Sequence, residues 1–328
     1  MTAPGLPGRK VSLTGIKPTS LPHLGNYLGA IRPALALKES HETRYFIADY
    51  HALTTLKTPG TIREHVYDVA ATWVACGLDA EQTLLYRQSD VPEVFELMWV
   101  LACIVATGQL ERGHAYKDAV AQGDAPNAGV FNYPLLMAAD ILLYDADVVP
   151  VGRDQLQHIE LTRDLAERLN YLTEAPVVTV PQVELTEGPL VLGLDGRKMS
   201  KSYGNALPLF ASEKDLKAGV MRIKTGSEPL EAPKDPEGTV LWNLYCHVTT
   251  EDEQAHLRAR LLAGGFGWGH AKVELLAALE AVLGPMRPRF HALRADEPAL
   301  DRLLVAGAQR ARPIARQTLD RLRTAFKL

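Results

Sequence analysis

Two lysines three residues apart stand in the stretch Lys198-Met199-Ser200-Lys201-Ser202. Lysine ammonium groups are compact charges on flexible stems, so this pair suits phosphate oxygens whose charge changes during a reaction. Small polar residues between the lysines, and Asp195-Gly196-Arg197 before them, predict a mobile loop. A short basic loop is usually a solvated turn when taken alone, so a second element has to support phosphate binding.

That second element runs from Pro18 to Asn26, near the N-terminus. Residues 10–16 predict a buried strand and residues 26–37 have apolar residues at helical spacing, so the element connects a strand to a helix. The free N–H groups where the helix begins attract phosphate, and Gly25 lets a nucleotide approach the backbone closely. His23 can donate a hydrogen bond to a phosphate oxygen. The two segments together predict two parts of one ATP-binding site.

Other phosphate-binding and catalytic motifs are absent from the sequence. It has no G-x-x-x-x-G-K-[ST] motif and no G-x-G-x-x-G after the first strand, which disfavours a P-loop and a nicotinamide cofactor. It has no paired His/Cys cluster for catalytic zinc and no G-x-S-x-G nucleophile motif. We therefore expect no protein-bound metal centre, and we assign phosphate binding to His23, the helix terminus and the lysine loop.

Strand-like and helical segments alternate over the first two thirds of the chain. The predicted strands are residues 10–16, 44–48, 83–87 and 147–151. The predicted helices are residues 26–37, 61–77, 92–122, 133–143 and 155–170, with Thr61 and Glu64 as a capping box. This alternation predicts a Rossmann-like α/β fold with a doubly wound parallel sheet.

Beyond Asn205 the strand-like patterns nearly vanish. The predicted helices of this part are residues 213–223, 239–248, 251–264, 270–285 and 297–326. We expect a catalytic domain of residues 1–208, with a helical insertion at about 90–128 and the lysine loop, and an all-helical domain of residues 209–328. Seven Lys and Arg against two Asp in the last 28 residues favour a solvated helix face, with a nucleic-acid backbone contact as the alternative.

Composition is ordinary for a globular protein. The chain has 328 residues, 47% of them hydrophobic and 23% charged, and a formal net charge of -4. The three cysteines are far apart, which argues against a disulfide framework. No secretory signal and no apolar run of membrane-spanning length is present, so we expect a cytoplasmic protein without membrane contact.

Several motifs resemble class I aminoacyl-tRNA synthetases. His23-Leu24-Gly25-Asn26 is similar to the HIGH element of that class, and residues 198–202 reproduce its KMSKS loop. Residues 25–30, 133–144 and 149–155 resemble bacterial tryptophanyl-tRNA synthetases. The resemblance runs from about residue 10 to 206 and weakens over the helical remainder.

The resemblance implies that L-tryptophan is activated with ATP and transferred to tRNA(Trp). The substrate carboxylate is itself the nucleophile, so catalysis comes from positioning and from stabilising charge on the phosphates. Mg²⁺ would bridge the phosphates without a dedicated protein cage. The family also implies a homodimer, and the helical remainder would bind the anticodon stem-loop. The catalytic residues implied by the resemblance are Lys198, Lys201, His23 and Lys117.

The resemblance also assigns the substrate sites. The implied ATP-binding residues are Lys17, Pro18, Thr19, Gly25, Asn26, Gly152, Arg153, Asp154, Val191, Lys198, Met199, Ser200, Lys201 and Ser202. An indole N–H only donates, so its pocket needs an acceptor, and the carboxylate of Asp140 supplies one. The other implied tryptophan-binding residues are Tyr133, Met137, His51, Gln155, Val149 and Val151.

Two departures from the family concern the substrate sites. Lys17 stands where the family usually has Gln, and Leu13 stands where an aromatic residue is frequent. Lys17 adds a cation beside the phosphates or the carboxylate, and Leu13 removes a ring contact with indole. Ser20, Pro22 and Arg153 also replace more typical residues. We expect an active enzyme that is weaker than a standard member of the family.

Three other interpretations remain open at this stage. A tyrosyl-tRNA synthetase shares the fold and both ATP elements. A nucleotidylyltransferase uses a similar His-x-Gly-His turn, but Asn26 replaces the second His and the KMSKS loop is complete. A paralogue could bind tryptophan or a partner protein in a regulatory role without charging tRNA.

Overall fold

The computed structural model describes residues 8–328 except 56–57, 59, 122, 124 and 186–187. The chain forms two compact units. Unit 1 comprises Met1–Ser20, Ala34–Glu187 and Asp296–Leu328, and unit 2 comprises Leu21–Pro33 and Gly188–Ala295. The HIGH-like segment and the KMSKS loop group with unit 2 and the last helix groups with unit 1, whereas the expected division into two domains at residue 208 stays a prediction.

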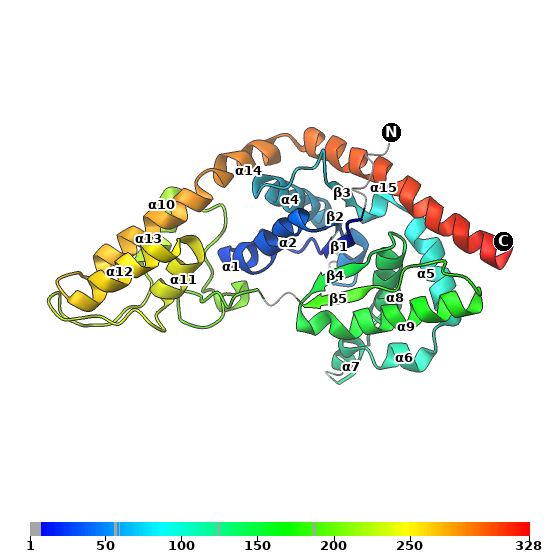
Figure 1. The fold of residues 1–328 in the computed structure, drawn as a ribbon, viewed down its shortest axis with the longest axis horizontal. Helices are drawn as coiled ribbons and strands as arrows, with labels where there is room; N and C mark the ends of the chain where they lie inside the picture. Colours follow the sequence, from blue (N-terminus) through cyan, green and yellow to red (C-terminus); the bar gives the residue numbers. More distant parts are fainter. Residues whose placement is uncertain (1–7, 56–57, 59, 122, 124, 186–187) are drawn as a thin grey trace. The chain divides into compact units, whose positions relative to one another are not determined.

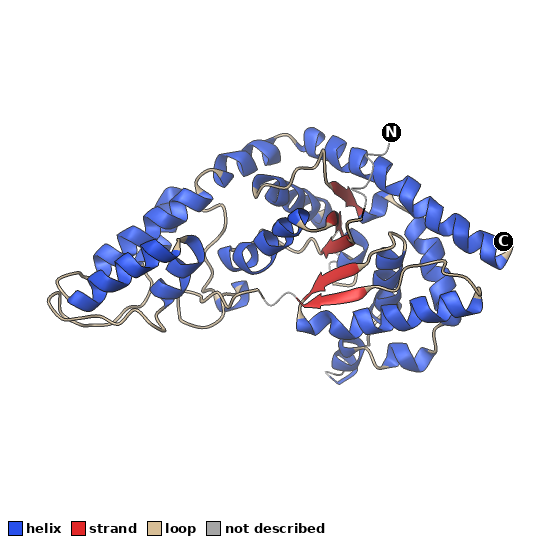
Figure 2. Cartoon of the chain, in the orientation of Figure 1, coloured by secondary structure: helices blue, strands red, loops and turns tan. Residues whose placement is uncertain are grey.

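Unit 1 is built on a five-stranded sheet in which each described pair of neighbours is parallel. The order is β3-β2-β1-β4-β5, drawn in red in Figure 2. The strands are β1 (Val11–Ile16), β2 (Glu42–Ile47), β3 (Leu84–Arg87), β4 (Val148–Val151) and β5 (Gln182–Leu185). The neighbours β2 and β4 lie on opposite sides of β1, which is the strand order of a doubly wound fold. The predicted fold class is confirmed.

Helices cover both faces of this sheet (Figure 1). The helices that lie wholly in unit 1 are α3 (Asp49–Ala52), α4 (Thr61–Ala75), α5 (Glu93–Ile104), α6 (Thr107–Glu111), α7 (His114–Ala121), α8 (Ala128–Leu142), α9 (Leu156–Leu172) and α15 (Glu297–Phe326), and α6 and α7 pack against α8. Alternate residues of β2 face opposite sides. Tyr45 packs on Trp73 of α4, with ring centroids 5.0 Å apart, whereas Phe46 belongs to the core formed with α5, α8 and α9.

The last helix, α15, approaches β3 very closely. A side chain at Gly307 would overlap the carbonyl oxygen of Leu85, so glycine permits this contact. The arginines of α15 then bind groups of unit 1. Arg310 donates to the backbone oxygens of residues 80, 81 and 83, and Arg312 pairs with Glu93 at 2.9 Å. These cations hold the helix in place, which agrees with a structural role rather than a nucleic-acid contact.

Replacing Gly307 by alanine should lower the free energy of unfolding by about 3 kcal/mol, because the new methyl group forces α15 away from the backbone of β3. Gly269→Ala is the matched control, since nothing lies within 4 Å of a Cβ at that helical position. Alanine there should be neutral or slightly stabilising. Urea unfolding of both variants measures the difference, and equal stability of the two would contradict this packing.

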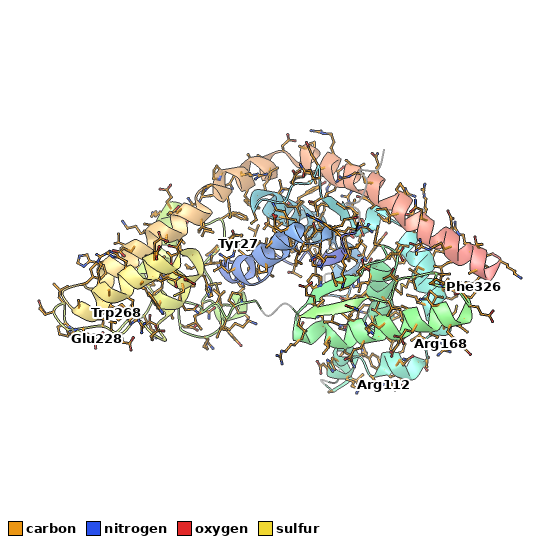
Figure 3. The ribbon with its side chains drawn as sticks, in the orientation of Figure 1. Tyr27, Arg112, Arg168, Glu228, Trp268 and Phe326 are labelled. Carbon is orange, nitrogen blue, oxygen red and sulfur yellow. The ribbon has the colours of Figure 1, made fainter. Side chains whose placement is uncertain are left out.

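Unit 2 contains α1 (Leu24–Asn26), a π-helical turn at Tyr27–Ile31, and five longer helices. The longer helices are α10 (Glu213–Met221), α11 (Val240–Val248), α12 (Glu251–Ala263), α13 (Trp268–Leu283) and α14 (Met286–Ala295). The short helix α2 (Arg32–Ala36) crosses from unit 2 into unit 1. Trp268 is 7% exposed and its Nε1–H donates to Glu228 at 2.8 Å (Figure 3). The predicted helices correspond to α10–α13 and α15, whereas α14 was not predicted.

Some local predictions were wrong. Thr61 is the first residue of α4, and Gly60, with a φ of 88°, precedes it as the N-cap. Glycine tolerates that left-handed conformation, whereas threonine does not. The stretch 92–122 is broken into α5, α6 and α7, and β5 was not predicted. In the described part of the chain, no helix is long and apolar enough to cross a membrane.

Candidate active site

Four segments of unit 1 follow strands at the same edge of the sheet. Residues 17–19 follow β1, residues 49–51 follow β2, residues 88–90 follow β3 and residues 152–154 follow β4. The register pairs Ile16 with Ile47 and Ile47 with Arg87, so the strand ends are level. Residues 17–19 and 152–154 border the switch between β1 and β4, where ligands bind in open α/β sheets.

Asp140 of α8 is a buried carboxylate with fixed partners at this edge. It is 2% exposed, and the Nε2–H group of His51 donates to its Oδ2 at 2.9 Å. The Gln88 amide donates to both carboxylate oxygens at 2.8 Å, and Gln88 Oε1 accepts the backbone N–H of Tyr50 at 3.1 Å. Burial raises the pKa of Asp140, while the bonds from His51 and Gln88 oppose that rise. One lone pair on Oδ1 remains for a further donor.

A second polar chain connects α8 to the turn after β4. The Tyr133 hydroxyl lies 2.6 Å from His158 Nε2, and His158 Nδ1 lies 3.0 Å from Gln155 Oε1. The Gln155 amide donates to Asp154 at 2.8 Å. Tyr133 and His51 are ring neighbours, with centroids 6.4 Å apart, so this chain lies beside the Asp140 group. Burial raises the pKa of Tyr133 and lowers the pKa of His158.

The remaining predicted residues of unit 1 differ in burial. Val149 is buried, whereas Met137 and Val151 are half-buried against the core. Gly152 is the N-cap of a 3-10 turn at Arg153–Gln155. Arg153 and Asp154 are exposed, Pro18 is buried, and Thr19 is exposed. Lys17 donates to Thr54 at 3.4 Å, and burial lowers its pKa. Lys117 is exposed on α7 and makes no side-chain bond to the other predicted residues within the described chain.

In unit 2, His23 caps the first helical turn. Its Nδ1 accepts the backbone N–H of Asn26 at 3.3 Å, and the Asn26 side chain accepts the backbone N–H of His23 at 3.0 Å. This reciprocal capping box fixes both side chains. His23 is 8% exposed, and burial followed by the charge of Lys201 lowers its pKa to about 4. The ring is therefore neutral at pH 7 and carries its proton on Nε2, as a donor.

Replacing His23 by asparagine should flatten the pH dependence of stability between pH 6.5 and about 4. In this window the unfolded chain binds a proton on His23 that the folded chain does not bind, so acidification lowers the free energy of unfolding. Asparagine retains an N-cap acceptor but does not titrate. Urea unfolding at both ends of this pH window should show that acidification lowers the free energy of unfolding more for the wild-type chain than for the variant. An equal decrease for both chains would refute the lowered pKa of His23.

The KMSKS loop is anchored next to the His23 turn within unit 2. Met199 is 4% exposed, its sulfur accepts the backbone N–H of Gly25 at 3.2 Å, and its own N–H donates to the carbonyl of Val191 at 2.9 Å. A Cβ at Gly25 would lie 3.0 Å from the His23 ring and 3.2 Å from the Cβ of Met199, so a larger residue there would crowd both side chains. The Lys201 ammonium group donates to the carbonyl of Leu21.

The side chain of Asn205 holds the backbone of the same loop through hydrogen bonds. It is 3% exposed, accepts the N–H of Ser200 at 2.8 Å, and donates to the carbonyl of Lys198 at 3.2 Å. Its amide also donates to Asp195 at 2.7 Å, and this bond is the main reason that the pKa of Asp195 falls to about 2. Lys198 and Ser202 remain exposed, and the Ser202 hydroxyl lies 2.8 Å from the Ser200 hydroxyl. The loop thus presents its lysines to solvent from a fixed base.

A family model described as tRNA synthetases class I (W and Y) matches residues 8–284. The chain belongs to this family. It is therefore an aminoacyl-tRNA synthetase of class I. The match covers the HIGH-like segment, the KMSKS loop and both polar chains described above.

Relatives of this synthetase are similar over nearly its whole length. A tryptophan–tRNA ligase of Neisseria meningitidis serogroup A is 45% identical over 97% of both chains, and one of Fusobacterium nucleatum is 44% identical over 93% of this chain and 94% of its own. The solved tryptophanyl-tRNA synthetase of Campylobacter jejuni in complex with ADP and tryptophan is 38% identical, with a TM-score of 0.90. That likeness covers 97% of this chain and 100% of the solved chain.

The synthetase structure brings the predicted residues together in two groups. In unit 1, Asp140 is hydrogen-bonded to His51, and Tyr133 is connected through His158 to Gln155 and Asp154. In unit 2, His23 lies next to the KMSKS loop. Sequence reasoning missed three residues that orient these groups: Gln88, His158 and Asn205. Only the position of Gln88 carried a signal, because it follows the predicted strand 83–87 as His51 follows 44–48. Leu13, expected near indole, is 1% exposed in the core.

Proposed function

We propose that this synthetase activates L-tryptophan with ATP and transfers it to tRNA(Trp). A carboxylate oxygen of tryptophan attacks the α-phosphorus of ATP, and pyrophosphate leaves with the electrons of the broken P–O bond. A terminal ribose hydroxyl of the tRNA then attacks the carbonyl carbon of tryptophanyl-adenylate, and AMP leaves. The observation that carries the proposal is the buried Asp140 carboxylate, which Gln88 and His51 hold with one acceptor position remaining.

Unit 2 supplies the groups that stabilise the phosphates. Lys198 and Lys201 provide positive charge to the departing pyrophosphate, and the neutral His23 donates from Nε2. Met199 and Asn205 fix the base of the loop, so the lysines need little reorganisation. ATP enters with Mg²⁺ bound by phosphate oxygens. Among the described residues, no group of three or more His, Cys, Asp or Glu side chains could hold a metal ion.

Unit 1 supplies the amino-acid pocket and the groups for adenosine. Asp140 accepts the indole N–H, and Met137, Val149 and Val151 line the indole ring. A ligand without that N–H leaves a buried carboxylate under-satisfied, which penalises phenylalanine. Asp154 lies two residues after Gly152 and accepts the ribose hydroxyl groups. The opposite side of the switch between β1 and β4 is formed by Lys17, Pro18 and Thr19.

The partners named by the resemblance remain proposals. The helical part after residue 208 binds the anticodon stem-loop, because RNA loops expose unstacked bases to side chains. A homodimer and a cytoplasmic location are predictions from the family and the composition. Gel filtration with light scattering of the purified chain tests the dimer, and a mass equal to one chain would contradict it.

Tryptophan is favoured over tyrosine by the relatives. The ligases named for tryptophan are 44–46% identical to this chain, whereas the tyrosyl-tRNA synthetase structures of Archaeoglobus fulgidus and Aeropyrum pernix are 20% identical and share the fold alone. ATP–pyrophosphate exchange with tryptophan, tyrosine and phenylalanine tests the assignment. We expect exchange with tryptophan and at least about 100-fold less with the other two. A preference for tyrosine would refute the proposal.

A further inference from the structure

The KMSKS loop begins as one side of a small antiparallel hairpin in unit 2. The backbone N–H of Met199 donates to the carbonyl of Val191 at 2.9 Å, and Leu192 forms an antiparallel bridge with Lys198. The other side of the hairpin is the extended segment 190–192. The position of the loop backbone therefore depends on the position of this segment.

The second edge of the segment 190–192 is covered by one side chain, Asn243 of α11. Its Nδ2 group donates to the carbonyl of Leu190 at 3.0 Å, and its Oδ1 accepts the N–H of Leu192 at 2.8 Å. Successive residues of an extended chain direct their backbone groups to opposite edges, so these two groups face away from the edge that Val191 shares with Met199. A primary amide offers a donor and an acceptor, as a backbone peptide does. Asn243 thus takes the place of a neighbouring strand.

The two bonds determine the orientation of the Asn243 amide. A backbone carbonyl only accepts and a backbone N–H only donates, so exchanging Nδ2 and Oδ1 would break both bonds. One helical turn later on α11, His247 Nε2 lies 3.3 Å from the same Leu190 carbonyl. Leu190 therefore has a second donor, whereas Asn243 is the partner that the described chain provides for the N–H of Leu192. Loss of the Asn243 side chain would release the segment at Leu192.

We propose that Asn243 is a positioning residue for ATP, because it fixes the segment 190–192 and with it the backbone of Val191 and Met199. The inference rests on the proposed function, in which Val191 and Met199 bind ATP. Asn243 itself does not touch the nucleotide. It acts through the backbone, since its bonds on one edge of the segment keep the other edge paired with the KMSKS loop. Tryptophan binding, which we assign to unit 1, should not depend on it.

Binding of two ligands to the full chain tests the proposal. Isothermal titration calorimetry measures the affinity for ATP with Mg²⁺ and, separately, the affinity for tryptophan. Asn243→Ala should weaken ATP binding about tenfold, because two hydrogen bonds to the segment are lost, and should leave tryptophan binding unchanged. Unchanged ATP affinity, or equal weakening of both ligands, would overturn the proposal.

The matched control is Gln254→Ala. The Gln254 amide also holds backbone of unit 2, because it donates to the carbonyls of Cys246 and Thr249 at the end of α11. These bonds are made outside the segment 190–192, so the variant should leave the affinity for both ligands unchanged. Weakening of ATP binding equal to that of Asn243→Ala would show a general effect of α11 and overturn the proposal.

Asn243→Asp keeps the proposal testable if the alanine variant fails to fold. Aspartate has the shape of asparagine and can accept from Leu192, but its carboxylate cannot donate to Leu190. ATP binding should again weaken selectively, and hydrogen exchange measured by mass spectrometry should become faster over residues 190–199. Unchanged ATP affinity or unchanged exchange would overturn the proposal. A wild-type chain that binds ATP but shows no tryptophan-dependent ATP–pyrophosphate exchange would instead refute the proposed function.

Discussion

Replacing Lys201 by alanine should lower the rate constant of tryptophan-dependent ATP–pyrophosphate exchange by about 100-fold or more. The Lys201 ammonium group lies beside the His23 turn, where its charge contributes to the lowered pKa of His23. A cation in that position stabilises the negative charge on the departing pyrophosphate. This charge is larger in the transition state than in the ground state, so the cation lowers the barrier. The KM for tryptophan should therefore change little, because unit 1 carries the amino-acid pocket.

The controls for this prediction come from the same unit. Lys214→Ala removes an exposed lysine of α10 and should leave exchange unchanged. Lys198→Ala should resemble Lys201→Ala, and the double variant should lose less than the product of the two single losses, since both act on one leaving group. A tenfold or larger rise in the KM for tryptophan with an unchanged rate constant would place Lys201 in amino-acid binding and contradict the assignment.

Replacing Asp140 by alanine should reduce kcat/KM for tryptophan by about 100- to 1,000-fold, or about 3 to 4 kcal/mol. The variant removes the acceptor for the indole N–H and leaves the Gln88 amide and the His51 ring without their common partner. The KM for ATP serves as the internal control and should change far less. A loss of affinity for both tryptophan and ATP would indicate that the substitution disrupts the structure at the carboxyl ends of the strands, rather than recognition of the indole N–H alone.

Asp140→Asn refines this prediction. Asparagine retains the shape of the side chain, but its NH₂ group must face a donor, either the Gln88 amide or the His51 ring. Activity should fall between that of alanine and wild type, because one oxygen acceptor survives. Adding Gln88→Glu should recover part of the loss, since a carboxylate can accept from the new amide. No recovery would show that Gln88 does not determine the orientation of residue 140.

The sequence alone predicted those parts of the candidate site that lie in recognisable motifs. The KMSKS loop and the HIGH-like turn were predicted from residue types at fixed spacing, and Asp140 was predicted from the family resemblance. Their roles stay predictions, and the structure gives each of them defined hydrogen-bond partners. The strand–helix alternation also predicted the sheet, since buried parallel strands have continuous apolar sequences. β5 was not predicted because it lies at the edge of the described sheet, where it pairs with β4, and because it carries the polar residues Gln182 and Glu184.

The features that the sequence did not predict depend on contacts between residues far apart in the chain. The periodicity of residues 297–326 predicted a helix but not its packing partner, which depends on the fit of Gly307 against Leu85, 222 positions earlier in the sequence. His158 and Asn205 resemble ordinary helix and loop residues until the fold places them against Tyr133 and Ser200. Orientation of functional side chains is set by such neighbours, and no local pattern encodes it.

Aminoacylation of tRNA(Trp) by the purified full chain tests the central claim most directly. Labelled tryptophan, ATP, Mg²⁺ and a tRNA(Trp) transcript are incubated with the protein, and charged tRNA is separated on an acid gel. The account predicts charged tRNA that depends on ATP and on tryptophan, and that forms about 100-fold more slowly, or slower still, with tyrosine or with the Lys201→Ala variant. Tryptophan binding without charging of tRNA(Trp) would contradict it and favour a regulatory paralogue.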